Sequence, residues 1–232
     1  MSGSDELNIW QKKKLLDYLL EFVTPHKQKL FFDIIQNRTR HLSIMLEDIY
    51  QSHNASAVLR TCDCFGIQDV HIVENRNKYE VNRDVALGSN KWLNLFKYGD
   101  KDHNTADAIN ALKKKGYRMV ATTLHRKAVP LNELSIDNKF VLLFGTELTG
   151  LSEEATEMAD EFCKIPMVGF TESLNISVTV AIMVHYLSEK IRAAEIDWEL
   201  SETEKTEILL DWARRVVKKP DVLERNYIKQ HL

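Results

Sequence analysis

Residues 140–151 read FVLLFGTELTGL, and the stretch changes character at Gly145. The five residues before this glycine form an unbroken apolar run, which is typical of a strand buried on both faces of a parallel sheet. The residues after it are polar and place Glu147 between Gly145 and Gly150. Because ligands of open α/β sheets bind beyond the carboxyl ends of the strands, this loop is a predicted binding loop.

Two more polar segments follow predicted strands. Residues 54–61 (NASAVLRT) follow the first strand, and residues 165–177 (IPMVGFTESLNIS) run from the end of the last. Taken singly, each polar residue has a structural explanation: an asparagine can cap a helix, and a glutamate can cap a turn. Taken together, one arginine, one glutamate and two asparagines at strand ends predict a functional site.

The middle of the chain alternates between β-like and helical patterns. This alternation predicts an α/β fold with a parallel sheet. The predicted strands are 42–49, 69–74, 92–98, 117–124, 140–144 and 162–167. The predicted helices are 53–65, 105–115, 152–160 and 175–194.

Both ends of the chain are predicted to be helical. Apolar residues recur at helical spacing over Leu7–Val23, and Pro25 opens a second helix to about Asn37. Neither helix can bury its apolar stripe alone, so both must dock on a domain or a partner chain. The capping box Ser201–Glu204 opens a helix to about Lys218, and Pro220 starts a final short one. We expect a helical arm at 1–40, a core at 41–195 and a helical tail at 196–232.

Composition is that of an ordinary globular protein, with 232 residues, 44% hydrophobic and 28% charged. No apolar run is long enough to cross a bilayer, and the N-terminus lacks the order of a secretory signal. A cytoplasmic protein without a membrane partner is therefore expected. Three cysteines argue against a disulfide scaffold. Cys62 and Cys64 lack a second ligand pair, so we expect no metal site.

Net charge is −3, but the basic residues concentrate at the ends. Trp10–Arg40 holds seven basic and three acidic residues, and the chain from Asp211 onward holds six and three. These ends are either solvated helix faces or contacts for nucleic-acid phosphates. The dinucleotide, P-loop and nucleophile-elbow motifs are absent, which excludes the standard sites of those classes.

The three polar segments resemble the motifs of the SPOUT methyltransferase superfamily, in its SpoU/TrmH branch. Asn54, Ala57, Arg60 and Thr61 are similar to motif 1, and 143–151 resembles motif 2. A third segment resembles motif 3: it reads Ile165-Pro-Met167-x-Gly169, followed by Ser173-Leu-Asn175-Ile-Ser177. The stretch Gly88-Ser89-x-x-Trp92 also looks like a family feature. The likeness covers roughly residues 41–192.

The resemblance implies a parallel-sheet SPOUT core with a deep C-terminal trefoil knot, a homodimer formed through the knot region, and S-adenosylmethionine as methyl donor. It implies five catalytic-site residues, of which Arg60 is central: Arg60, Asn54, Glu147, Asn175 and Ser173. It implies eight cofactor-binding residues: Thr123, Leu124, Gly145, Gly150, Ile165, Met167, Leu174 and Ile176.

Helical additions at both ends are similar to those of enzymes that methylate the 2′-hydroxyl of guanosine 18 in the tRNA D-loop. The predicted partner is therefore tRNA. Two alternatives stay open from the sequence: a 2′-O-methyltransferase of rRNA or of another tRNA position, and a non-catalytic RNA-binding protein with this fold.

Overall fold

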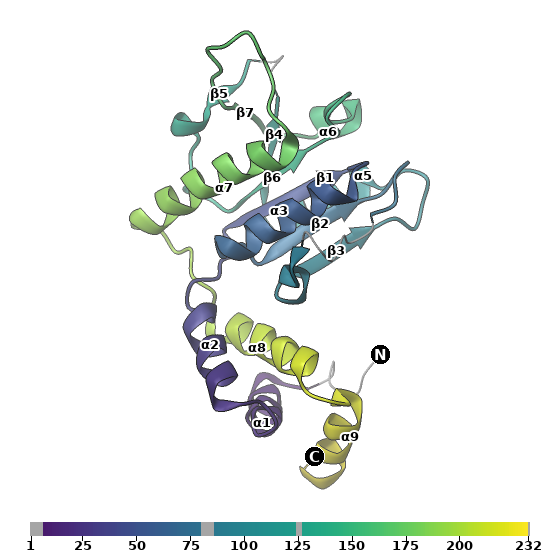
Figure 1. The fold of residues 1–232 in the computed structure, drawn as a ribbon, viewed down its shortest axis with the longest axis vertical. Helices are drawn as coiled ribbons and strands as arrows, with labels where there is room; N and C mark the ends of the chain where they lie inside the picture. Colours follow the sequence, from purple (N-terminus) through teal and green to yellow (C-terminus); the bar gives the residue numbers. More distant parts are fainter. Residues whose placement is uncertain (1–6, 80–85, 124–126, 232) are drawn as a thin grey trace. The chain divides into compact units, whose positions relative to one another are not determined.

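The computed structural model describes residues 7–79, 86–123 and 127–231, and these divide into two compact units (Figure 1). One unit is continuous, from Thr39 to Trp198. The other combines both ends of the chain, Met1–Arg38 and Glu199–Leu232.

The continuous unit is built on a sheet whose described strands are all parallel and lie in the order β3-β2-β1-β6-β4-β7-β5. The strands are β1 (Leu42–Glu47), β2 (Asp69–Val73), β3 (Asn94–Tyr98), β4 (Arg118–Thr122), β5 (Val129–Pro130), β6 (Phe140–Phe144) and β7 (Glu161–Lys164). The predicted α/β class is confirmed. The order reverses beside β1, where β6 enters between β1 and β4, and such switch points are where ligands of these sheets bind.

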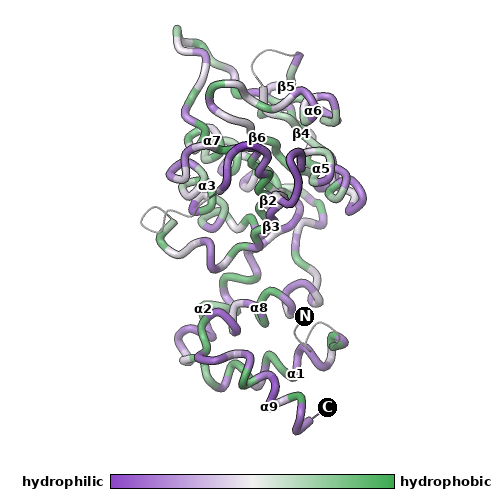
Figure 2. The backbone as a smooth tube through the Cα atoms, turned by 90° about the vertical axis from the view of Figure 1, so that its right-hand side faces the viewer, coloured by the Kyte–Doolittle hydropathy of each residue, from purple (hydrophilic) through white to green (hydrophobic). Residues whose placement is uncertain are grey.

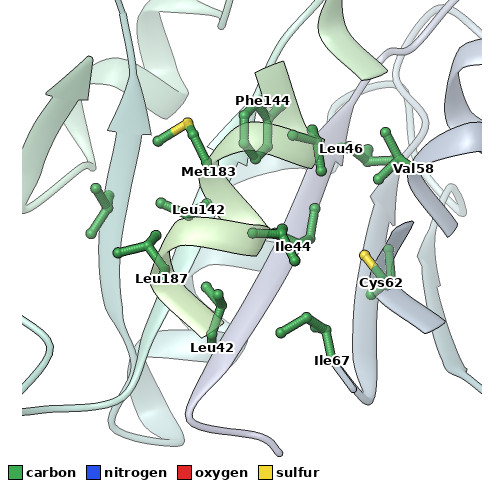
Figure 3. Close-up of a cluster of buried hydrophobic side chains, with 14 of the residues drawn as sticks. Leu42, Ile44, Leu46, Val58, Cys62, Ile67, Leu142, Phe144, Met183 and Leu187 are labelled. Carbon is green, nitrogen blue, oxygen red and sulfur yellow. The ribbon is translucent and has the colours of Figure 1, made fainter. Parts of the chain in front are cut away.

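Helices cover both faces of this sheet. They are α3 (Ser52–Cys64), α5 (Thr105–Lys114), α6 (Glu153–Glu157) and α7 (Ile176–Ala193), with short 3-10 turns η1 (Ser89–Lys91) and η2 (Leu131–Glu133). Side chains of a strand point alternately to its two faces. In β1, Leu42, Ile44 and Leu46 accordingly share a core with α3 and α7, as Figure 3 shows, whereas Met45 joins the core under α5.

Because helices cover both faces of the sheet, β1 is more buried than its sequence pattern predicts. Residues 42–49 alternate as a half-exposed strand would, yet every residue of β1 is buried. Two carboxylates of the described strands are among the buried side chains, Glu47 at the end of β1 and Asp69 at the start of β2. Buried carboxylates are rare unless hydrogen-bonded or paired, so each has a structural or functional reason.

The second unit consists of α1 (Ile9–Leu20), α2 (Pro25–Ile35), α8 (Glu202–Val216) and α9 (Pro220–His231). Hydrophobic and hydrophilic stretches alternate along its helices, as amphipathic helices require (Figure 2). The apolar face of α1 packs on α8 and α9, and Lys12 pairs with Glu207 at 2.6 Å. The predicted arm therefore docks on the predicted tail. Among the described residues, no helix is long and apolar enough to span a membrane.

Candidate active site

Four neighbouring strands of the sheet, β1, β6, β4 and β7, carry the loops of the candidate site at their carboxyl ends. The loop after β6 contains Glu147, and the segment after β7 leads into α7. Parallel strands bring all these ends to one edge, which is why segments separated by more than a hundred residues meet there.

A cavity of about 610 Å³ lies at this edge, a volume typical of small-molecule sites. Seven of the eight predicted cofactor-binding residues line it: Thr123, Gly145, Gly150, Ile165, Met167, Leu174 and Ile176. The eighth, Leu124, lies outside the described residues. Of the five predicted catalytic-site residues, Glu147 and Ser173 also line the cavity.

Three of the predicted catalytic-site residues are joined by hydrogen bonds beside the cavity. The Oε1 atom of Glu147 accepts from Nδ2 of Asn54 and from Nδ2 of Asn175, both at 2.8 Å. Asn175 Nδ2 also donates to Oδ1 of Asn54 at 3.2 Å. One residue from each of the three sequence segments therefore meets at a single point.

Local structure explains how each of these side chains is held. Asn175 is the N-cap of α7, where its Oδ1 accepts from the backbone N–H of Ser177 at 2.9 Å. Asn54 is not an N-cap, because Gln51 takes that position; it is buried in the first turn of α3, with 4% of its surface exposed. The side chain of Glu147 bonds to both asparagines rather than capping its own turn.

The turn that carries Glu147 is closed by backbone contacts. Thr146 and Gly150 exchange two backbone hydrogen bonds of 3.0 Å. A Cβ atom on Gly145 would lie 2.0 Å from the carbonyl oxygen of Gly150, so only glycine fits there. This close approach is the physical reason for glycine at the first position of the motif.

Arg60 lies apart from the other four residues. It sits in the middle of α3 with its side chain exposed, and it does not line the cavity. Among the described residues, its guanidinium forms no hydrogen bond or ion pair. The geometry within this one chain therefore brings together Asn54, Glu147 and Asn175, but not Arg60.

Other residues line the cavity without standing out in the sequence. They include apolar and hydroxyl side chains such as Phe162, Thr179 and Met183, and the carboxylate of Glu172. Cys163 also lines it, and burial raises the pKa of its thiol to about 12, with the charge of Glu161 adding to the effect. A thiol that stays protonated is a poor nucleophile, which argues against covalent catalysis by this cysteine.

Comparison with known proteins agrees with this geometry. Residues 41–185 match the SpoU rRNA Methylase family. The chain is 46% identical over 211 residues to the tRNA (guanosine(18)-2'-O)-methyltransferase of Borreliella burgdorferi, covering 91% of this chain and 95% of that one. The chain belongs to the SpoU rRNA methylase family.

Solved structures of SpoU proteins share the fold. The A. aeolicus TrmH/SpoU tRNA modifying enzyme superposes with a TM-score of 0.72 at 31% identity, covering 83% of this chain and 98% of that chain. The SpoU methyltransferase AviRb from Streptomyces viridochromogenes, solved in complex with the cofactor AdoMet, has a TM-score of 0.57 at 19% identity, covering 70% of this chain and 62% of that one. The resemblance to the SpoU/TrmH branch is confirmed.

Proposed function

We propose that this chain transfers a methyl group from S-adenosylmethionine to the ribose 2′-hydroxyl of guanosine 18 in tRNA. The observation that carries the proposal is the contact of Asn54, Glu147 and Asn175 beside the cavity. The Borreliella burgdorferi relative, named for this reaction, matches across both the core and the helical ends. A non-catalytic binding protein would have no need for all three polar residues in one cluster.

The cavity suits S-adenosylmethionine in size and in chemistry. Ile165, Met167 and Leu174 offer apolar walls for an adenine ring, and the peptide groups of the 145–151 loop offer hydrogen bonds. Glu147 and Glu172 provide negative charge for a cationic ligand. When bound, the donor would supply an electrophilic methyl group on a positively charged sulfur, which leaves as a neutral thioether when the acceptor oxygen takes the methyl group.

The acceptor hydroxyl must lose its proton during the transfer, and the chain must align it. The guanidinium group of arginine is in general a poor base, so a general-base role does not suit this residue type. We assign Arg60 a different role: its guanidinium grips the neighbouring phosphate, orients the ribose and stabilises the developing negative charge on the oxygen. The hydroxyl proton then passes to phosphate or water. Asn54, Glu147 and Asn175 hold the loops that face this ribose, and Ser173 supports the methionine end of the donor.

A homodimer would bring Arg60 to a cavity that it does not reach in one chain. On α7, Val178, Ile182 and Tyr186 form an exposed apolar stripe at helical spacing, 38–45% exposed. Leu148 and Phe170, in the loops at the site, are almost fully exposed. We propose that a second copy covers these residues. The trefoil knot and the cytoplasmic location both stay predictions.

The dimer has a direct test. Ile182→Asp places a charge in the exposed stripe without touching the buried side of α7, so the monomer should stay folded. Sedimentation velocity should then show monomers where the wild type shows dimers, and methylation should be lost. Wild-type sedimentation as a monomer at micromolar concentration would contradict the proposal.

The helical unit is the proposed tRNA-binding element, through phosphate contacts that carry no sequence information. Not every basic residue in it is available. Arg214 is held by Glu224 at 2.5 Å and Asp211 at 2.9 Å, so it stabilises the junction of α8 and α9. Lys218 and Lys219 are exposed in the turn between α8 and α9 and are better candidates for phosphate contact.

One experiment tests the reaction and its alternatives. Purified protein is incubated with labelled S-adenosylmethionine and separate pools of unmodified tRNA and rRNA, and the modified ribose is mapped. We expect label at guanosine 18 of tRNA, and none with Glu147→Ala. Label in rRNA or at another tRNA position would favour the related enzymes, and donor binding without transfer would favour a binding protein.

A further inference from the structure

We infer that Glu47 is a positioning residue for the cofactor cavity: it anchors the downstream end of the 145–151 loop. This inference rests on the proposed function, because it takes the cavity as the site of S-adenosylmethionine. Glu47 is the last residue of β1, and only 2% of its surface is exposed. It does not line the cavity and touches none of the three clustered polar residues through a hydrogen bond.

Both oxygens of the Glu47 carboxylate accept hydrogen bonds from neutral donors. Oε1 accepts from the hydroxyl of Thr105 at 2.5 Å and from the hydroxyl of Ser152 at 2.7 Å. Oε2 accepts from the backbone N–H of Ser152 at 2.8 Å. No lysine, arginine or histidine of the described chain pairs with it. Burying a carboxylate without a cationic partner costs desolvation free energy, and the three hydrogen bonds offset this cost while they fix Ser152 and Thr105 in place.

Ser152 links these hydrogen bonds to the loop that lines the cavity. Ser152 is the N-cap of α6, where its hydroxyl also accepts from the backbone N–H of Ala155 at 3.0 Å. It directly follows Gly150 and Leu151, which line the cavity. Glu47 therefore fixes the point where the loop ends, and the tight turn at 146–150 transmits this position to Glu147.

Asp48, the next residue in the chain, holds the loop after β2 in a similar way. Asp48 has a left-handed backbone with φ of 53°, and its Oδ1 accepts from the backbone N–H groups of Asn75 and Arg76 at 2.7 and 2.8 Å. Asn75 in turn donates to the hydroxyl of Thr105 at 2.9 Å. The end of β1 thus holds three loops in register, and Thr105 at the start of α5 is shared between them.

The test measures donor affinity in the full chain by calorimetry, with Glu47→Gln as the first variant. The amide carries no charge and can accept at only one of its two positions, so a charge-assisted bond to Ser152 is lost or replaced by a weaker neutral one, and the loop gains freedom. We expect the dissociation constant for S-adenosylmethionine to rise about tenfold, as loss of a bond to a charged group implies. The KM for the donor should rise in parallel, with kcat at saturating donor changed less than threefold.

The chain offers a matched control at the opposite edge of the sheet. Asp69 is another buried carboxylate, 7% exposed, held by Asn94 at 2.8 Å and by Arg40 at 3.1 Å. Asp69→Asn should lower the melting temperature while leaving donor affinity unchanged. Equal weakening of donor binding by both variants would reduce Glu47 to a general stabilising residue.

A second variant, Ser152→Ala, keeps the inference testable even if Glu47→Gln folds poorly, because wild-type donor affinity in folded Ser152→Ala would also overturn it. Ser152→Ala removes the hydroxyl but keeps the backbone N–H that Glu47 binds. It should therefore weaken donor binding less than Glu47→Gln does. If Glu47 acts through Ser152, the double variant should bind the donor about as weakly as Glu47→Gln alone. Additive effects, or wild-type affinity in Glu47→Gln, would overturn the inference. If the wild type itself does not bind the donor, the proposed function fails instead.

Discussion

Replacing Gly145 by alanine is a sharp test of the site, because the structure shows what the added methyl group would meet. The new Cβ would lie 2.0 Å from the carbonyl oxygen of Gly150 and 2.3 Å from the backbone nitrogen of Leu151. Cβ atoms essentially never approach other heavy atoms closer than 3.0 Å, so the backbone must move by about 1 Å. The atoms in the way are main chain, which no side-chain rotation can relieve.

The size of the effect follows from what that movement breaks. Two backbone hydrogen bonds between Thr146 and Gly150 would be lost or stretched, at about 0.5–1.5 kcal/mol each. Overpacking adds about 1–3 kcal/mol. If half of this total, about 1–3 kcal/mol, must be recovered to close the loop around the donor, the affinity falls by about fivefold to 150-fold, with about thirtyfold at the midpoint.

Isothermal titration with S-adenosylmethionine measures the change. Gly116→Ala serves as the control, since Gly116 ends α5 with φ of 80° and lies outside the cavity. Its Cβ would sit 3.5 Å from the Lys139 side chain, so backbone strain of about 1–2 kcal/mol is the main cost. Gly116→Ala should lower stability and spare donor binding. Donor affinity in Gly145→Ala within threefold of wild type would refute the reasoning.

Three further predictions follow from the surface and the sheet. Arg60→Lys should fold normally, because Arg60 is exposed. Its turnover should fall at least about tenfold, because lysine lacks the two-pronged guanidinium that binds a phosphate through two hydrogen bonds. Wild-type turnover would exclude the proposed phosphate contact. Replacing both Lys218 and Lys219 by glutamine should weaken tRNA binding and reduce the slope of log affinity against log salt by up to about 2, whereas an unchanged slope would make them solvated surface residues. Burial lowers the pKa of His71 to about 3, so the unfolded chain binds a proton below pH 6.5 that the folded chain does not. The unfolding free energy should thus fall by about 2 kcal/mol between pH 7 and 5, and His71→Phe, followed by urea denaturation, should remove that part of the slope.

The sequence predicted the main strands and helices because short apolar runs and amphipathic stripes report local geometry. It also predicted that residues from the three motif segments lie together: parallel strands bring their carboxyl ends to one edge, and Asn54, Glu147 and Asn175 meet there. Boundaries shifted where local structure intervened. The strand expected at 92–98 begins at Asn94, because η1 ends just before Trp92.

Other features depend on neighbours that no local pattern reveals. Glu47 looks like an ordinary charged residue at a strand end, and only the arrival of Ser152 and Thr105 from distant segments shows its role. The two-residue strand β5 is too short to leave a pattern. The placement of Arg60 away from the cavity depends on which side of α3 faces solvent, which the motif spacing alone does not determine.

The pairing of α1 with α8 has a consequence for the protein during its synthesis. Leu15, Leu16 and Leu19 are buried in the finished molecule, but their partner helix leaves the ribosome only after the whole sheet domain has been made. Protein synthesis adds about 5–20 residues per second, so the apolar face of α1 stays exposed on the nascent chain for about 10–40 s. The first helices to be synthesised are thus among the last to pack. Until then the nascent chain exposes an apolar surface of the kind that chaperones for hydrophobic segments bind.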